Sequence, residues 1–262
     1  MAEWLRRGLQ ILVRGFDSLR GLQFAGLVPA PRVVRIAEGF MLDFAAARRT
    51  MVDRQVRTFD VTNLAIIAAF DEAPREKFVP PGREALAYSD VAVPLDSTAP
   101  FARRCLLAPM IVARMLQALD LSEGEAVLDA GCATGYTTLL LHRLGARVTG
   151  LEPDEALAAA AREALAESGA GGVEIAVGPI AAGYAKGAPY DAILLNSAFE
   201  VQPQALLDQL VDGGRLVGID ATEAVATASL YVKRGTALSR QPLFGASAPI
   251  VDGLEAPAKF VF

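Results

Sequence analysis

The chain has 262 residues, of which 53% are apolar and 21% charged, so it can build the core of one α/β domain with an appendage and is not globally disordered. Its net charge of -5 argues against nucleic acid as the main partner. Two cysteines and one histidine exclude a disulfide framework and a Cys/His zinc cluster, and no apolar run has the length of a transmembrane helix. We therefore expect no metal site and a reducing, cytoplasmic location.

Residues 1–40 differ in charge from the rest of the chain. They contain six arginines against Glu3, Asp17 and Glu38, a local charge of +3. Apolar residues recur there at helical spacing, namely Trp4, Leu5, Leu9, Leu12, Val13, Phe16 and Leu19. A basic amphipathic N-terminal extension of this kind is typical of contact with a membrane surface or a partner protein. The alternatives are that it covers an apolar patch of its own domain or is weakly ordered.

Residues 41–100 are predicted to form a helical N-terminal part of the main domain. Residues 44–58 are rich in strong helix formers. Residues 60–63 can cap a second helix over residues 64–70. Residues 101–262 then alternate strand and helix patterns, which predicts a ligand-binding α/β domain.

The chain is organised around residues 127–136, which read V-L-D-A-G-C-A-T-G-Y. A short apolar run ends in Asp129, a glycine-bearing turn follows, and residues 137–141 open a helix. In a doubly wound sheet, such a loop lies where ligands bind, beyond the carboxyl ends of the strands. The dinucleotide pattern G-x-G-x-x-G fails here because, counted from Gly131, the other two glycine positions hold Ala133 and Tyr136.

An acid at the strand end favours a cationic ligand over a phosphate. S-adenosylmethionine carries an ammonium and a sulfonium, so Asp129 could hold the ammonium while Gly131 and Gly135 let the backbone approach the ligand. Glu152 ends the next predicted strand, about 20 residues beyond the first glycine, where an acid can accept from ribose hydroxyls. The alternative is an ordinary βα turn with a structural acid, in which Glu152 only favours a helix N-terminus.

The remaining α/β pattern is regular. Helices are predicted over residues 154–168 and 204–210, and strands over residues 173–177, 192–195 and 215–219. Asn196 and Ser197 follow the fourth strand and should face the same crevice as Asp129. Residues 229–233 and 259–262 are expected to form an antiparallel edge pair.

Several ordered motifs resemble the protein-L-isoaspartate O-methyltransferase family. They are D-R-Q-V-R (53–57), P-R-E-K-F-V-P (74–80), A-Y-S-D (87–90), A-P-M-I-V-A-R-M (108–115), the 127–136 loop, G-A-P-Y-D-A-I (187–193) and P-Q-A-L-L-D-Q-L-V-D-G-G-R-L (203–216). The last forty residues are instead similar to those of a divergent bacterial branch of this family.

The resemblance implies a Rossmann-like class I methyltransferase fold: a mostly parallel seven-stranded sheet with helices on both faces. It also implies S-adenosylmethionine as cofactor and the α-carboxylate of isoaspartyl residues, in a protein or peptide, as acceptor. The candidate cofactor-binding residues are Asp129, Gly131, Cys132, Thr134, Gly135, Glu152 and Asn196. No catalytic residue is assigned.

Two departures from the family pattern leave the acceptor open. The family's Q-T-I-S-Q-P segment, anchored on Pro109, reads R-C-L-L-A-P here, so Leu107 replaces a serine near the methyl group. The family's G-D after the third strand is Gly178-Pro179, so an acid expected near the adenine is missing. Ser97, Thr98, Asn196 and Ser197 are candidate substitutes for the lost hydroxyl. The alternatives are a methyltransferase of the same fold with another acceptor, or a non-catalytic module.

Overall fold

The computed structural model describes residues 34–36, 39–95 and 104–257. Most of the predicted N-terminal extension therefore lies outside the described residues, and so do Ser97, Thr98 and residues 259–262. Within residues 34–41, the strands β1 (Val34–Ile36) and β2 (Gly39–Met41) pair in antiparallel register. Residues 33–262 form one compact unit.

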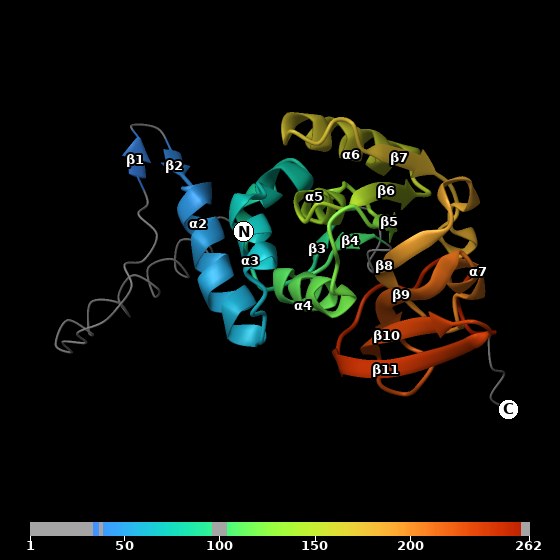
Figure 1. Ribbon diagram of the computed structural model, residues 1–262. Helices are drawn as coiled ribbons and strands as arrows, with labels where there is room; N and C mark the ends of the chain where they lie inside the picture. The colour runs from blue at the N-terminus through green and yellow to red at the C-terminus, as the bar shows by residue number, and fades with distance from the viewer. Residues whose placement is uncertain (1–33, 37–38, 96–103, 258–262) are drawn as a thin grey trace, which may run out of the picture. The chain divides into compact units, whose positions relative to one another are not determined.

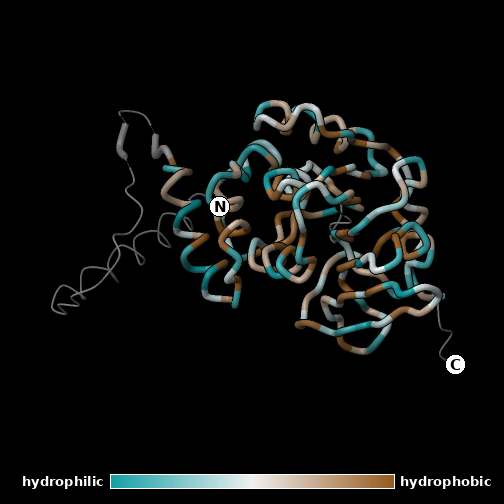
Figure 2. The backbone as a smooth tube through the Cα atoms, viewed as in Figure 1, coloured by the Kyte–Doolittle hydropathy of each residue, from teal (hydrophilic) through white to brown (hydrophobic). Residues whose placement is uncertain are grey.

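The N-terminal helices begin at the residues that their sequence predicts. α2 (Phe44–Met51) starts after Asp43, whose side chain accepts from the Ala46 amide, and continues as a π-helix (Val52–Val56) and a 3-10 turn (Arg57–Phe59). α3 (Leu64–Glu72) starts after Asn63, whose side chain accepts from two amides of the first turn. Apolar and polar residues alternate in blocks along α2 in Figure 2, whereas α3 is apolar over residues 64–70 and hydrophilic only at its end.

The segment between α3 and the main sheet consists of short elements. They are the 3-10 turns Arg75–Phe78 and Glu84–Leu86, the strands β3 (Val93–Pro94) and β4 (Cys105–Leu106), and α4 (Pro109–Leu119). Arg75 is fully buried and holds this segment together, because its Nε donates to the Ala87 carbonyl at 2.8 Å and its Nη2 to the Leu107 carbonyl at 2.7 Å.

The main sheet has seven strands in the order β11-β10-β9-β8-β5-β6-β7 (Figure 1). The strands are β5 (Ala126–Ala130), β6 (Arg147–Glu152), β7 (Glu174–Val177), β8 (Tyr190–Phe199), β9 (Leu210–Asp220), β10 (Thr227–Arg234) and β11 (Ala237–Gly245). β5 to β9 pair in parallel, and β10 and β11 add an antiparallel edge. The strand order reverses between β5 and β8, which is the switch point at which α/β sheets bind ligands.

Helices and turns connect the parallel strands. They are α5 (Tyr136–Arg143), α6 (Glu155–Glu167), the 3-10 turns Ile180–Ala182 and Ala185–Gly187, and α7 (Gln204–Asp208). Alternate strand residues pack on opposite faces of the sheet: Val127 joins the core under α4, α5 and α6, whereas Leu128 joins the core under α7 and the turn after β7. The expected mostly parallel seven-stranded sheet with helices on both faces is confirmed.

The edge pair differs from the sequence prediction. β10 contains residues 229–233 as expected, but its partner is β11, which no predicted element covered. A two-residue turn at Gly235, with φ of 59°, makes the hairpin a local structure. In the part of the chain that the structure describes, none of the helices has the length and hydropathy needed to cross a bilayer.

Candidate functional site

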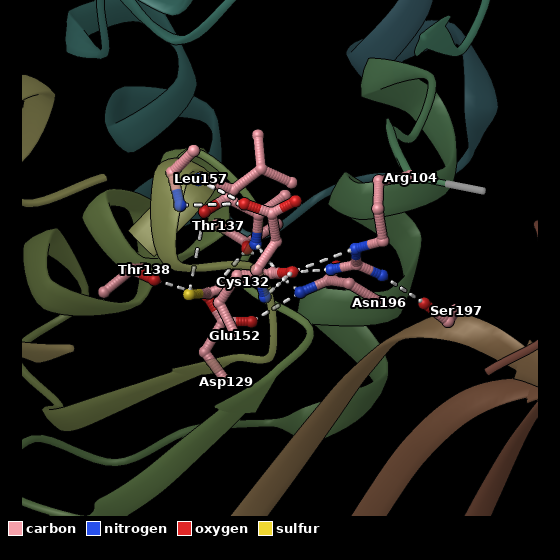
Figure 3. Close-up of polar contacts among 12 residues, drawn as sticks. Arg104, Asp129, Cys132, Thr137, Thr138, Glu152, Leu157, Asn196 and Ser197 are labelled. Carbon is pink, nitrogen blue, oxygen red and sulfur yellow. Dashed lines mark hydrogen bonds and ion pairs between the residues drawn. The ribbon is translucent and has the colours of Figure 1, made fainter. Parts of the chain in front are cut away.

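Three of the predicted site residues meet at the carboxyl ends of adjacent parallel strands. Asp129 lies near the end of β5, Glu152 ends β6, and Asn196 lies in β8 on the other side of β5. Asp129 and Glu152 are both completely buried. Figure 3 shows these side chains gathered around the loop after β5, in one network with Arg104 and Ser197.

The carboxylate of Asp129 has only neutral hydrogen-bond donors. The hydroxyls of Thr137 and Thr138 donate to its Oδ2 at 2.7 and 2.6 Å, and the Asn196 amide donates to its Oδ1. Burial raises the pKa of Asp129 to about 6, and the nearby charge of Glu152 raises it as well. The two hydroxyls and the charge of Arg104, which pairs with Glu152, oppose this. Asp129 is therefore a buried acid without its own ion-pair partner among the described residues.

Glu152 does have an ion-pair partner, Arg104. The Nε and Nη2 of Arg104 donate to the two oxygens of Glu152 at 3.2 and 2.5 Å, and its Nη1 donates to the Ser197 hydroxyl at 3.0 Å. The Ala133 amide also donates to Glu152 at 2.8 Å. The guanidinium lies over the loop, because a Cβ added to Gly131 would be 3.2 Å from its Nη2. Arg104 thus covers the carboxylate predicted to meet a ribose.

The loop itself contains three residues with left-handed backbone, Gly131, Ala133 and Gly135, the last with φ of 90°. Gly131 has φ of 77°, and the side chains of Arg104 and Ile180 lie over its backbone. Ala133 has φ of 53°, which is uncommon for a residue with a side chain. The bond from the Ala133 amide to Glu152 holds this otherwise unfavourable conformation.

Three loop residues, Cys132, Thr134 and Gly135, contact other parts of the protein in this structure. A Cβ on Gly135 would meet Ala161 and Leu165 of α6 at 3.2 and 3.3 Å, so this glycine permits helix packing and not ligand approach. The Cys132 side chain is buried in the core, where burial raises its pKa well above the usual value. The Thr134 hydroxyl donates to the Phe78 carbonyl at 2.5 Å. Cys132 and Thr134 can therefore offer a ligand only their backbone.

Two cavities flank this network. A tight one, of about 10 Å³, is lined by Leu107, Ala133, Thr137 and Asn196 among others, and it places Leu107 against the loop, as the alignment on Pro109 predicted. A larger one, of about 270 Å³, begins at Arg104 and extends past the ends of β6 and β7.

The residue that sequence reasoning missed is Arg104. It stands in the R-C-L-L-A-P segment, three residues before Leu107, but nothing in its local sequence indicates a partner 48 residues away. A substitution of glutamine by arginine beside a predicted acidic site was the available signal.

Comparisons with known proteins agree with this geometry. The model of the protein-L-isoaspartate(D-aspartate) O-methyltransferase family matches residues 47–242. The protein-L-isoaspartate O-methyltransferase 1 of Rhodopseudomonas palustris is 39% identical over 174 residues, covering 66% of this chain and 69% of the relative. The enzyme of Methanoculleus marisnigri is 36% identical over 198 residues, covering 76% and 88%.

Solved structures support the fold. One named protein-L-isoaspartate O-methyltransferase superposes with a TM-score of 0.71 at 21% identity, covering 79% of this chain and 67% of that chain. A Plasmodium falciparum protein of the same name, in complex with S-adenosyl-L-homocysteine, gives 0.65 at 16% identity, covering 78% and 97%. With these matches and the motifs above, the chain belongs to the protein-L-isoaspartate(D-aspartate) O-methyltransferase family of S-adenosylmethionine-dependent enzymes.

Proposed function

We propose that this chain binds S-adenosylmethionine at the carboxyl ends of β5 and β6 and methylates the α-carboxylate of isoaspartyl residues in proteins. The observation that carries the proposal is the buried Asp129 carboxylate, which has three neutral donors and no cation of its own among the described residues. A buried negative charge without a counter-ion is costly, so the site favours a ligand with a positive group.

The other residues fit the same ligand. Once Arg104 moves away, Gly131 leaves space over the backbone of the loop and Glu152 can accept from two ribose hydroxyls. The 270 Å³ cavity continues from Arg104 past Pro153 and Pro179, and its mostly apolar wall suits an aromatic base. In this assignment, Asn196 acts by orienting Asp129, and Cys132, Thr134 and Gly135 shape the loop.

When bound, S-adenosylmethionine supplies an electrophilic methyl group for the acceptor carboxylate. A carboxylate is already ionised at neutral pH, so no residue of the chain has to act as a general base. The chain has to align the acceptor and exclude water. The cavity at Leu107 has room for one water molecule at most, and its wall includes Leu106, Leu107 and Ala133. Polar side chains such as Thr137 and Asn196 also line this cavity, so its small volume is what suits the exclusion of water.

Leu107 favours a second candidate for the methyl acceptor. Its side chain cannot orient a carboxylate as the family serine does, and Ser197 is already bonded to Arg104. The alternative function is methylation of another carboxyl or small-molecule acceptor on the same scaffold.

The decisive experiment measures methyl transfer to an isoaspartyl peptide beside calorimetric binding of S-adenosylmethionine, with the matching aspartyl peptide as control. We expect donor binding and methylation of the isoaspartyl peptide only. Donor binding with product from an unrelated acceptor, and none from the isoaspartyl peptide, would select the alternative. Absence of donor binding would reject both.

A substitution pair tests the role of Leu107. Leu107→Ser should raise kcat for the isoaspartyl peptide with an unchanged donor Kd, because it restores a hydroxyl beside the loop. Leu116→Ser is the matched control, since Leu116 is likewise a buried leucine and should lose similar stability but does not line this cavity. Equal kcat values for the two variants would contradict a role for the hydroxyl.

We also propose that the chain acts in the cytoplasm and that residues 1–40 contact an anionic membrane surface or a partner protein. The support is the charge of +3 and the helical apolar spacing in the sequence. Co-sedimentation of the full chain with vesicles of mixed anionic and neutral lipid tests the membrane contact. Binding independent of anionic lipid would count against it.

A further inference from the structure

The 270 Å³ cavity beside Arg104 has a wall from a part of the chain that the family match does not cover. One side comes from the ends of β6 and β7, with Pro153, Pro179 and Ile180. The other side comes from Ile250, Val251 and Asp252, which lie beyond residue 242, where the family match ends. The cavity is therefore completed by a C-terminal segment that lies outside the family match.

Backbone bonds hold this segment, residues 249–254, against the end of β8. The Ala198 amide donates to the Pro249 carbonyl at 2.9 Å, and the Val251 amide donates back to the Ala198 carbonyl at 2.8 Å. The amides of Glu200 and Val201 donate to the Leu254 carbonyl at 2.8 and 3.1 Å. The segment is thus bonded to the sheet from both of its ends.

Side-chain packing supports the same placement. Val251 and Leu254 are 3% and 6% exposed and join the core on the α7 side of the sheet. A Cβ on Gly253 would lie 3.3 Å from Ala181 in the turn after β7. Residue 252 is therefore fixed beside the cavity by its neighbours on both sides.

Asp252 is the one acid among the described residues that line this cavity. Its side chain has no hydrogen bond or ion pair to any other residue in the described ranges. Its carboxylate is thus an acceptor available to a ligand, in a wall that is otherwise apolar apart from Arg104. The acid that the family pattern would place after β7 is absent, because that position is Pro179.

We propose that Asp252 accepts a hydrogen bond from the exocyclic amino group of the cofactor's adenine and so makes this site selective for a 6-aminopurine. Adenine has two apolar faces and a polar edge, which match the proline and isoleucine wall and a single acceptor. The C-terminal segment, which is bonded to the end of β8, thereby supplies the acid that the loop after β7 lacks. This inference rests on the proposed binding of S-adenosylmethionine.

Calorimetry with two neutral zwitterions tests the proposal: S-adenosylhomocysteine and S-inosylhomocysteine, which has a carbonyl in place of the amino group. Because neither ligand has a net charge, removal of a carboxylate should not change their binding through long-range attraction. We expect the unsubstituted chain to prefer the adenosyl ligand at least tenfold. Asp252→Ala should weaken adenosyl binding by about 10- to 100-fold, as expected for a lost charge-assisted bond, and leave inosyl binding nearly unchanged.

Two further variants sharpen the test. Asp252→Asn should abolish most of the preference, because an amide can donate to the inosyl carbonyl. Glu255→Gln is the control, since it removes the same charge from the same segment but keeps an acceptor for the Gly253 amide. We expect it to bind both ligands as the unsubstituted chain does.

The outcomes separate the two proposals. Equal loss of both ligands in Asp252→Ala, or unchanged adenosyl binding, would overturn the role of Asp252 while leaving the cofactor site in place. Failure of the unsubstituted chain to bind S-adenosylhomocysteine would overturn the proposed function, and this inference with it.

Discussion

The ion pair between Arg104 and Glu152 sets two opposite expectations for the substitution Arg104→Gln. In the ligand-free chain, the pair neutralises a fully buried carboxylate, and the arginine side chain is only 15% exposed. When a ribose binds Glu152, the pair has to break. The substitution should therefore destabilise the ligand-free protein and strengthen cofactor binding.

The structure sets the size of both effects. Removal of one member of a largely buried pair costs about 3 kcal/mol, which corresponds to a fall in Tm of roughly 6–12 °C for a domain of this size. The Ala133 amide stays bonded to Glu152 and limits the loss. In the variant, the cofactor no longer has to break the ion pair between Arg104 and Glu152 before it binds. We therefore expect its affinity to rise by about 10- to 100-fold, or roughly 1.4–2.7 kcal/mol.

Differential scanning calorimetry of the ligand-free protein and titration calorimetry with S-adenosylmethionine measure the two quantities. Arg215→Gln is the matched control, because Arg215 forms a comparable pair with Glu125 at 2.6 Å, with side chains 17% and 21% exposed, at the opposite ends of the strands. It should lower Tm and leave cofactor affinity unchanged. A lower Tm for Arg104→Gln with equal or weaker cofactor binding would refute the idea that Arg104 competes with the ribose.

Three further results are expected. Cofactor affinity should fall about tenfold per pH unit below pH 6, because the carboxylate form of Asp129 binds the ammonium and burial raises the pKa of Asp129 to about 6. An affinity that calorimetry finds constant between pH 5 and 8 would contradict this role. Since the folded ligand-free chain holds this proton more tightly than the unfolded chain, the stability from Asp129 is full below about pH 4 and lost as pH rises through 6. Between about pH 4 and pH 7, the free energy of unfolding measured in urea should therefore fall by about 3 kcal/mol more in the unsubstituted chain than in Asp129→Asn. A difference between the two proteins that does not change with pH would count against this. Arg75→Met should lower the free energy of unfolding by roughly 2–4 kcal/mol, because the Ala87 and Leu107 carbonyls lose their donors. The control Arg49→Met, at an exposed position, should change it by less than about 0.5 kcal/mol. Similar values for the two variants would show that the bonds of Arg75 are unimportant for stability.

The sequence alone determined the features that depend on neighbouring residues. The caps at Asn63 and Asp154 act on amides two or three residues away, so the starts of α3 and α6 were predictable. The acids at positions 129 and 152 follow apolar runs, and parallel strands bring their carboxyl ends to one edge of the sheet. The meeting of these acids around a glycine loop followed from strand order alone.

Only the tertiary structure decided which groups those acids contact. The pairing of Arg104 with Glu152 and the approach of Asp252 to the cavity join residues far apart in the chain, and no local pattern records them. The sequence predicts that Gly135 lets a ligand approach the backbone, but a glycine looks the same in a sequence whether a ligand or a helix packs against it. In the structure, α6 packs against Gly135. Periodicity and capping are local energies readable along the chain, whereas ion pairs and cavity walls depend on how distant segments pack.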